Sequence, residues 1–384
     1  MKKSDLIKKN IKSLKIVQKQ LFFKKNIFKT KNKKNVLISY IVTPIYNSND
    51  KSHSNVAEVN LIIKFFKENQ YNIDIVDFNY KLDIDFNKYD IIIGFGNPLE
   101  NAIKNNASCK KILYITGQNP YINNLNSISR LNQFKKRHNR FIIESMRIAE
   151  ELWPIQLTAC DEMIVLGNDV TKDTFKQFYK GNIHKLNAPA FTSLTELNNK
   201  KDYNLAKMNF VWFGSRGAIH KGLDILIDIF KKRNDINLYI CSDLEKEREF
   251  FKLYKNEITK RDNIFYKGFV SLESDIFKNI SNTCGYVIVP SCAEGQCTSV
   301  LNCMNAGMVP IVTKECGIDI NENGFEIDEI NDENIENVIN KAISIDDESL
   351  IKMSHNVFKD IKENYSLDNY YTNISKILSK ILSN

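Results

Sequence analysis

The chain has 384 residues, of which 43% are hydrophobic and 26% are charged, a composition typical of a globular protein of about two domains. The formal net charge of +8 comes mainly from a lysine-crowded segment before Asn35, in which Asp5 is the one acid, while the rest is near neutral. The charge balance therefore gives no support to a nucleic-acid-binding core. The sequence has no secretory signal and no run of about 18 apolar residues, so we expect a cytoplasmic protein without a membrane-spanning helix.

The eight cysteines do not indicate a metal centre. None of them forms a C-x-x-C pair, and the four between residues 292 and 316 lack the spacings of a zinc site, so we expect reduced thiols. Asp83 and Asp85 form an alternating acid pair that could hold a metal. Their stretch is polar and loop-like, however, and such pairs are common by chance, so we predict no metal site.

Apolar residues recur at helical spacing among the lysines of residues 1–34, which predicts a helix followed by a basic connector. A basic amphipathic helix can lie on an anionic membrane, here the inner face of the cytoplasmic membrane. A helix docked on the protein, or a disordered tail, is the alternative. The apolar positions are Ile7, Ile11, Leu14, Leu21 and Phe28.

Short apolar runs rich in β-branched residues alternate with helix-sized intervals through residues 35–190. This alternation predicts a doubly wound parallel sheet, and hence a first Rossmann-like domain of the α/β class. We expect helices over residues 55–68, 141–158 and 169–179. The expected strands are residues 35–43, 71–78, 90–94, 111–116 and 162–166.

Periodicity is lost between residues 186 and 207, where Pro, Asn, Thr and Lys collect, and we place an interdomain linker at residues 191–208. A second series of strand-like runs then begins at residues 209–213. We therefore predict a second domain over residues 209–364.

The first loop of this second domain, residues 214–222, reads Gly-Ser-Arg-Gly-Ala-Ile-His-Lys-Gly. Arg216 offers a bidentate fork and Lys221 a point charge on a glycine-rich turn, a combination that suits phosphate. The loop is not a Walker motif, because Gly222 rather than Ser or Thr follows the lysine. A basic surface turn is the alternative interpretation of the loop alone.

Residues 286–313 predict a strand, a polar loop, a helix and a second strand, the unit of a parallel α/β sheet. The loop contains Glu294, the helix can start at Cys297 or Thr298, and Gly307 is a natural stop. Ligands of such sheets bind at the carboxyl ends of the strands, near helix N-termini. A carboxylate beside free backbone N–H groups suits a ligand that carries both hydroxyls and phosphate.

This stretch resembles the retaining glycosyltransferases of family 4, which have the GT-B fold. Their signature is a glutamate, seven residues, a second glutamate, and then a small residue, Gly and Pro. Glu294 matches the first acid, Asn302 stands where the second is expected, and Ala306, Gly307 and Pro310 match the close. The resemblance implies that Glu294 contacts the donor sugar and that position 302 binds the nucleotide ribose, here without a charge.

The loop at residues 214–222 also resembles that family, whose loop holds the donor pyrophosphate through cations matched by Arg216 and Lys221. The first half departs from the common glycine-rich pattern of the family. It is similar instead to a branch that makes capsular or surface polysaccharides, through residues 52–55, 114–119 and 166–168.

The resemblance implies two Rossmann-like domains that face a cleft, with a last helix, residues 365–384, that crosses back to the first domain. A nucleotide-diphosphate sugar would bind the second domain and a glycan or lipid-linked acceptor the first. The sugar would be transferred with retention of configuration and without a cofactor or metal. Another GT-B enzyme, such as a nucleotide-sugar epimerase or phosphorylase, or an inactive sugar-binding homologue, is the alternative.

The candidate catalytic residues are Glu294, Arg216 and Lys221, with His53 and Thr116 as candidates to assist deprotonation of the acceptor. The leaving phosphate itself is the alternative base. The candidate donor-binding residues are Gly214, Ser215, Arg216, Lys221, Gly295, Gln296, Cys297, Thr298, Ser299 and Asn302.

Overall fold

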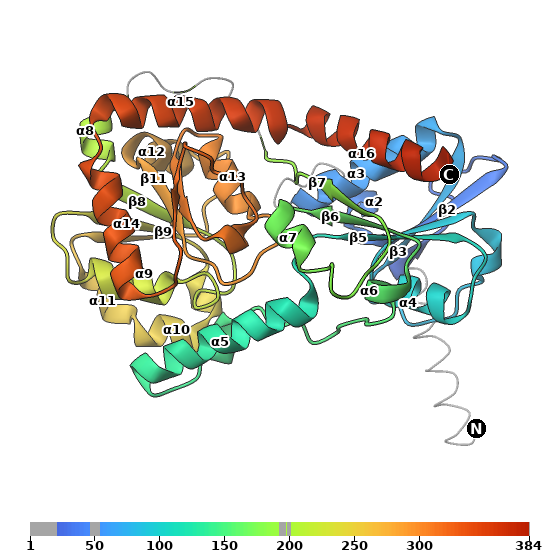
Figure 1. The fold of residues 1–384 in the computed structure, drawn as a ribbon, viewed down its shortest axis with the longest axis horizontal. Coiled ribbons are helices and arrows are strands. Elements are labelled where there is room, and N and C mark those ends of the chain that lie inside the picture. The colour runs from blue at the N-terminus through green and yellow to red at the C-terminus, as the bar shows by residue number, and fades with distance from the viewer. Residues whose placement is uncertain (1–20, 47–53, 192–196, 198–200, 384) are drawn as a thin grey trace, which may run out of the picture.

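The computed structural model describes residues 21–46, 54–191, 197 and 201–383 of the chain. The predicted α/β class is confirmed, because two sheets built from successive strand–helix units lie side by side with helices packed around each (Figure 1). Residues 1–20 of the predicted basic helix, and His53, lie outside the described residues.

The first sheet has seven strands in the order β1-β3-β2-β4-β5-β6-β7, and its neighbours are parallel except for β1 and β3. Val36 of the central strand β2 pairs with Ile73 on one side and Ile91 on the other. These apolar runs are buried from both faces, as expected for a parallel sheet covered by helices. The strands are β1 (Phe23–Lys24), β2 (Lys34–Tyr40), β3 (Tyr71–Asp77), β4 (Ile91–Gly94), β5 (Lys110–Ile115), β6 (Glu162–Leu166) and β7 (Ile183–Leu186).

Residues 21–22 are helical, as predicted, but the helical spacing that extends to Phe28 does not hold, because Phe23–Lys24 form an antiparallel edge strand on β3. Phe23 packs edge-on against Tyr80, with ring centroids 5.6 Å apart, whereas Leu21 and Phe28 are exposed. The open edge of β3 offers backbone hydrogen bonds that a helix could not use. This pairing overrides the helical spacing of the apolar residues.

Helices cover both faces of the first sheet. On one face α3 (Ser54–Glu68) buries Val59, Ile62 and Phe66, together with side chains of α16. The other face is covered by α4, α6 and the segment after α7. Helix α7 itself is shorter than the helix predicted at residues 169–179. The remaining helices of this half are α2 (Thr43–Tyr46), α4 (Asn97–Lys104), α6 (Gln156–Ala159) and α7 (Asp169–Asp173).

The helix predicted over residues 141–158 is wrong, and a long helix, α5 (Pro120–His138), precedes that segment. The Asn119 side chain caps α5, proline occupies its first turn, and Asn139 ends it in the left-handed conformation at φ 51°. Within residues 141–158 the helical parts are residues 143–145 and α6. Pro154 has no backbone N–H to donate, so it interrupts a continuous helix.

The second sheet has six parallel strands in the order β10-β9-β8-β11-β12-β13. Its core contains the buried Trp212, Phe210 and Tyr286 and includes side chains from both flanking helix layers. The strands are β8 (Asn209–Phe213), β9 (Asn237–Cys241), β10 (Ile264–Gly268), β11 (Tyr286–Val289), β12 (Val309–Val312) and β13 (Phe325–Glu326). The helices are α8 (Tyr203–Ala206), α9 (Leu223–Phe230), α10 (Arg248–Leu253), α11 (Lys255–Lys260), α12 (Asp275–Thr283), α13 (Thr298–Met304), α14 (Asp332–Ser344), α15 (Asp347–Asn364) and α16 (Leu367–Ser383).

Two helices cross from one sheet to the other. In Figure 1, α15 and α16 run along the top of both sheets, and α16 packs on α3 and β7 of the first. Helix α5 runs the opposite way below them: Leu131 and Phe134 belong to the core of the second sheet. Each half of the chain therefore lends one helix to the other half.

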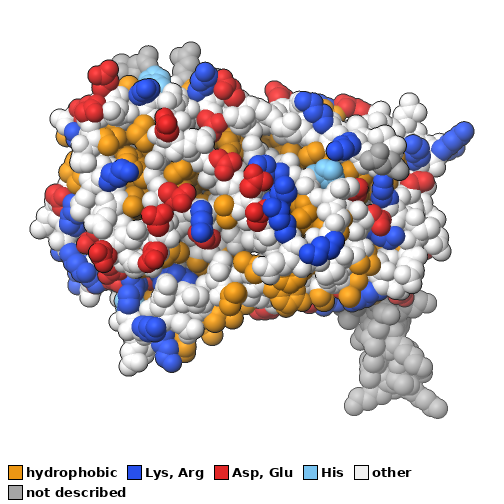
Figure 2. Space-filling view, in the orientation of Figure 1, with side chains coloured by type: hydrophobic (Ala, Val, Ile, Leu, Met, Phe, Trp, Pro, Cys, Tyr) orange, Lys and Arg blue, Asp and Glu red, His pale blue; other side chains and the backbone are white. Residues whose placement is uncertain are grey.

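The surface seen in Figure 2 mixes both signs of charge, with a band of apolar side chains along the lower edge, where Figure 1 shows α5. Tyr121, Leu125 and Ile128 of α5 are exposed. Within the described ranges, no helix is both long enough and apolar enough to cross a bilayer.

Candidate active site

Lys221 and Glu294 meet at the carboxyl ends of two neighbouring strands. The loop that contains Lys221 follows β8, the loop that contains Glu294 follows β11, and β8 pairs directly with β11. The Lys221 ammonium donates to Glu294 Oε1, which also accepts a hydrogen bond from the Ser291 hydroxyl at 3.1 Å. The topology of the sheet thus joins two candidates that are 73 residues apart.

A second cation reaches the same carboxylate from outside both motifs. Arg147 Nη1 donates to Glu294 Oε2 at 3.0 Å, so each carboxylate oxygen has its own cationic partner. Sequence reasoning missed Arg147, because it lies in a segment read as an ordinary amphipathic helix. No local motif marks it, and only the path of the chain after α5 brings it here.

Lys221 and Glu294 are buried, whereas Arg147 reaches Glu294 from the exposed side, and the three charges stabilise one another. Burial alone would raise the pKa of Glu294, but the nearby Lys221 and Arg147 lower it to about 2. Burial opposes the charge on Lys221, yet the Glu294 carboxylate raises the pKa of the ammonium above its ordinary value. Both groups are therefore charged at neutral pH, and the site can attract an anion while it holds hydroxyls.

His220 fixes the backbone just before Glu294. Its Nε2 lies 2.6 Å from the carbonyl oxygen of Ala293, which can only accept, so Nε2 carries the proton. Nδ1 is then free to accept from the Ser127 hydroxyl of α5 at 3.2 Å. Burial lowers the pKa of His220 to about 4, and the neutral ring acts as a rigid spacer between α5 and the Glu294 loop.

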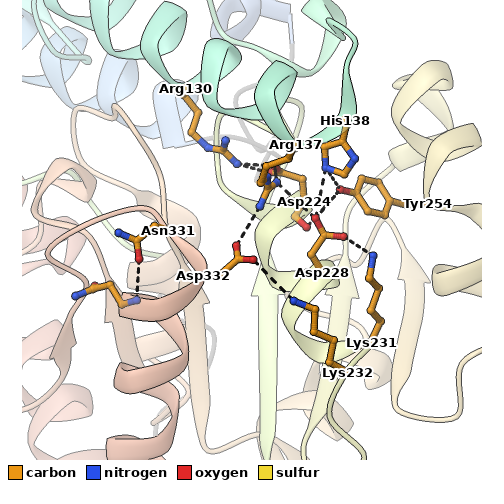
Figure 3. A network of polar contacts seen from close by, with 11 residues as sticks. Arg130, Arg137, His138, Asp224, Asp228, Lys231, Lys232, Tyr254, Asn331 and Asp332 are labelled. Atoms are coloured by element: carbon orange, nitrogen blue, oxygen red, sulfur yellow. Dashed lines mark hydrogen bonds and ion pairs between the residues drawn. The ribbon is translucent and has the colours of Figure 1, made fainter.

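Helix α5 is anchored to the second domain by buried charges (Figure 3). Arg130 of α5 donates to both carboxylate oxygens of Asp224 on α9, at 2.5 and 2.6 Å, and both side chains are almost fully buried. Arg137 also donates to Asp224 and bonds Asp332 of α14 at 3.2 Å. These contacts hold the chain that leads to Arg147 against the domain that contains Glu294.

A cavity of about 150 Å³ lies in front of Glu294, between the two sheets. Residues from both halves of the chain line it, so it is the cleft that the two domains share. From the first half come Tyr40, Ser54, Glu58, Thr116, Arg147, Leu166 and Ala188, and from the second half come Ser215, Lys221, Glu294, Gln296, Cys297, Thr298 and Ser299.

Most of the predicted donor residues after Glu294 lie at this cavity, at the start of α13. Gln296 bridges the halves: its Oε1 accepts from the Ala188 backbone at 2.5 Å and its Nε2 donates to the Gly317 carbonyl at 3.1 Å. A Cβ at Gly295 would lie 2.2 Å from the Thr116 carbonyl oxygen, so only glycine permits this close approach of the two domains.

Other predicted residues lie elsewhere. Arg216 is exposed, and its Nε donates to the Glu144 carbonyl at 3.3 Å rather than facing the cavity. Asn302 is a buried residue of α13, and its Oδ1 accepts from the Phe191 backbone at 2.9 Å. Gly214 packs beside the buried Trp212 ring.

Thr116, a candidate to assist deprotonation of the acceptor, lines the cavity.

The structure does not bring Asp83 and Asp85 to the cavity. Asp85 caps the short helical turn Phe86–Lys88 and pairs with Lys88 at 3.8 Å. Among the residues that the structure describes, no group of three or more His, Cys, Asp or Glu side chains is arranged to hold a metal ion.

Glu58 is another cavity-lining residue that the sequence analysis did not select. It lies on the apolar face of α3 and is 2% exposed, between Val56 and Val59 in the sequence. A carboxylate at a core-facing helical position was the available signal, since such a group is rarely buried without partners.

Two parallel α/β domains with a ligand-sized cavity between the ends of their strands define a GT-B protein, and solved structures support this class. The chain resembles sucrose-phosphate synthase from Thermosynechococcus elongatus, with a TM-score of 0.64 and 10% identity over 92% of this chain and 100% of that one. It resembles Anabaena HepE in complex with UDP and glucose, with a TM-score of 0.57 and 13% identity over 91% and 100%. WaaG, a glycosyltransferase involved in lipopolysaccharide biosynthesis, matches with a TM-score of 0.54 and 12% identity over 89% and 99%. At these identities the likeness establishes the fold, and the predicted GT-B architecture is confirmed.

Residues 196–360 match the family model of the glycosyl transferases group 1. Over this segment, which is less than half of the chain, the sequence is similar to the group 1 glycosyl transferases. None of the curated proteins compared with the sequence matches it.

Proposed function

We propose that this protein transfers a hexosyl group from a nucleotide-diphosphate sugar to a glycan or lipid-linked acceptor, with retention of configuration, in surface polysaccharide synthesis. The observation that carries the proposal is the charged cluster of Lys221, Glu294 and Arg147 at the cavity between the domains. It combines cations for a diphosphate with a carboxylate for sugar hydroxyls.

The division of labour follows the two walls of the cavity. Residues 209–364 would bind the donor and residues 35–190 the acceptor, joined by the linker at residues 191–208. As the bond between sugar and diphosphate breaks, negative charge develops on the leaving phosphate. Lys221 and Arg147 line the cavity and would stabilise that charge, and the burial of Lys221 strengthens its effect. Glu294 would accept hydrogen bonds from the sugar hydroxyls.

The donor is open to direct test. Two solved structures of the HepE neighbour are described as complexes with UDP and glucose and with UDP-glucose, which makes UDP-sugars the first choice. A thermal-shift screen of UDP-, GDP-, CMP- and ADP-sugars should identify the base, because a ligand that binds only the folded state raises its melting temperature. Absence of a shift with every nucleotide would refute donor binding.

A turnover assay separates transfer from the alternatives. With the identified donor, nucleoside diphosphate release that depends on an alcohol acceptor indicates transfer, whereas epimerisation of the donor or phosphorolysis indicates the other enzyme classes. Glu294→Gln should lower turnover strongly and leave nucleotide affinity nearly unchanged, the pattern of an interaction felt mainly in the transition state. Turnover equal to that of the unaltered protein would refute the role of Glu294.

We also propose that residues 1–34 bring the enzyme to the inner face of the cytoplasmic membrane, through their lysines. Co-sedimentation with anionic vesicles at low salt should require this segment and should be lost at high salt. A full chain that ignores such vesicles at low salt would refute the idea.

A further inference from the structure

The wall of the cavity opposite Lys221 contains a buried carboxylate. Glu58 lines the cavity from α3, beside Tyr40, Ser54 and Thr116. Around Glu58 the wall presents the hydroxyls of Tyr40, Ser54 and Thr116. The two cations that line the cavity, Lys221 and Arg147, both contact Glu294 instead. A neutral ligand rich in hydroxyls suits this wall better than a phosphate does.

Tyrosine hydroxyls aim the Glu58 carboxylate. Tyr40 and Tyr114 donate to the same oxygen, Oε2, at 3.1 and 3.0 Å, and Ser54 provides a further hydrogen bond. The Tyr114 hydroxyl has one proton, which it gives to Glu58, so the Tyr370 hydroxyl 2.8 Å away donates to the Tyr114 oxygen. Tyr370 comes from α16 and contacts Tyr114, but it has no hydrogen bond to Glu58 itself.

A carboxylate has roughly four positions that accept hydrogen bonds, and these three donors leave room for one more. Because Glu58 lines the cavity, the remaining donor can come from a bound molecule.

We propose that Glu58 is the residue that binds the reacting hydroxyl of the acceptor, an alcohol of a sugar or glycoside. The proposal rests on the function proposed above. In the bound acceptor this hydroxyl donates to Glu58, which places its oxygen beside the donor sugar. As the reaction begins, the hydroxyl rotates and directs its single proton to the leaving phosphate instead of to Glu58. The new bond forms between that oxygen and the anomeric carbon. The bond from that carbon to the diphosphate breaks, its electron pair leaves with the diphosphate, and the hydroxyl proton passes to a phosphate oxygen.

The energetics of the carboxylate agree with such a role. Burial raises the pKa of Glu58, and the hydrogen bonds from Tyr114, Ser54 and Tyr40 act in the opposite direction. A further hydroxyl donor stabilises the charged form in the same way. A bound acceptor hydroxyl would therefore provide the fourth hydrogen bond that the buried Glu58 carboxylate can accept.

The test compares Glu58→Gln with Tyr370→Phe. The first keeps the size of the side chain and removes its charge at the cavity, and the second removes a hydroxyl of the same network that does not line the cavity. UDP release from UDP-glucose is measured with water as the acceptor, and transfer is measured to a panel of alkyl glycosides that includes n-octyl β-D-glucopyranoside. If UDP-glucose is not the donor, the sugar nucleotide identified by thermal shift takes its place.

Glu58→Gln should lower acceptor-dependent transfer by about tenfold or more, mainly through the acceptor KM, because a hydrogen bond to a charged group is lost. Hydrolysis of the donor and its KM should stay within about twofold of the unaltered protein, as should every activity of Tyr370→Phe. If Glu58→Gln melts below the assay temperature, Glu58→Asp takes its place. This variant keeps the charge but moves it back from the cavity by one methylene, so the acceptor KM should rise in the same way.

Several outcomes would overturn the inference. Transfer by Glu58→Gln at the rate of the unaltered protein would do so. An equal loss of hydrolysis and transfer in Glu58→Gln and Tyr370→Phe would assign Glu58 to holding α16 in place. An unaltered protein that turns over no donor would instead overturn the proposed function, and the inference with it.

Discussion

Helices α5 and α16 cross between the domains in opposite directions, and both bury apolar side chains, but among the described residues only α5 adds buried ion pairs. Helix α16 buries Tyr370, Ile374 and two further apolar residues against the first sheet. Helix α5 buries Leu131 and Phe134 and also docks with charge, since Arg130 and Arg137 both pair with Asp224. Apolar burial adds stability in proportion to its area, whereas a buried ion pair recovers little beyond the cost of dehydrating it.

The two anchors therefore serve different ends. In the described part of the chain, Nε and Nη1 of the buried Arg130 have no hydrogen-bond partner, so its pairing with Asp224 is not optimised for stability. We infer that the α5 charges fix where the chain lies, and so where Arg147 meets Glu294, while α16 stabilises the union of the domains. Each helix also contacts a residue that supports the cavity: Tyr370 of α16 bonds Tyr114, and Ser127 of α5 bonds His220.

The largest effect should come from removing one charge of the α5 anchor. Asp224→Asn leaves Arg130 buried without its counter-charge, which should cost about 3–5 kcal/mol of the free energy of unfolding, measured by urea denaturation. The matched control is Asp235→Asn, which breaks an exposed pair with Arg233 and should cost less than about 1 kcal/mol.

A second variant asks whether the α5 charges specify position. Replacing the pair together, as Arg130→Met with Asp224→Leu, should cost less than Asp224→Asn alone, because no unpaired charge remains between the two. If the double variant is less stable than Asp224→Asn, the ion pair is a net source of stability. The α5 charges would then stabilise the protein as the apolar contacts of α16 do.

The α16 anchor should respond as an apolar core does. Ile374→Ala removes a fully buried side chain and should cost about 2–5 kcal/mol in the same urea experiment. Lys376→Ala on the exposed face of α16 should change stability by less than about 0.5 kcal/mol. Nucleotide affinity should be unchanged in Ile374→Ala, and a loss there would mean that α16 also shapes the donor side.

Helices and strands could be predicted where the local sequence pattern determines them. They could not be predicted where contacts with distant parts of the chain determine them. Strand β6 was predicted at its observed bounds, because its apolar run is buried on both faces. The N-terminal strand β1 escaped prediction, because its partner β3 lies about fifty residues away and its own sequence has helical spacing. Helix α5 was missed in spite of its Asn-Pro start, because its many polar residues obscure the apolar stripe formed by Leu131 and Phe134.

The same distinction applies to the cavity. Lys221 and Glu294 could be selected because each follows a strand in a recognisable loop. Arg147 and the tyrosines around Glu58 could not, because they converge from separate elements without any shared spacing. The position of Arg147 depends on how α5 docks, which no local pattern encodes.

The identity of the phosphate-binding arginine gives the next prediction. Lys221→Ala and Arg147→Ala should each weaken UDP binding by about 1.5–3 kcal/mol in calorimetry, the value of a charge-assisted hydrogen bond. Arg216→Ala should cost less than about 1 kcal/mol, because its exposed side chain bonds the Glu144 carbonyl away from the cavity. The loop pattern alone predicts an equal loss for Arg216. A larger loss of UDP affinity at Arg216 than at Arg147 would support the loop pattern. It would also mean that the segment after α5 does not bind the donor.

The smallest effect concerns a third junction between the halves, held neither by charge nor by apolar burial. At the end of the first half, Asn302 Oδ1 accepts from the Phe191 backbone N–H at 2.9 Å and Asn305 Nδ2 donates to the Phe191 carbonyl at 3.2 Å. Asn302→Ala should therefore cost about 1 kcal/mol of the free energy of unfolding, the value of one neutral hydrogen bond, and leave UDP affinity unchanged. Asn305→Ala is the matched control and should behave alike, since it removes the other half of the same clamp. If Asn302→Ala alone weakens UDP binding, its amide contacts the ribose in the complex, as the family pattern implies, and the clamp on Phe191 opens when the donor binds.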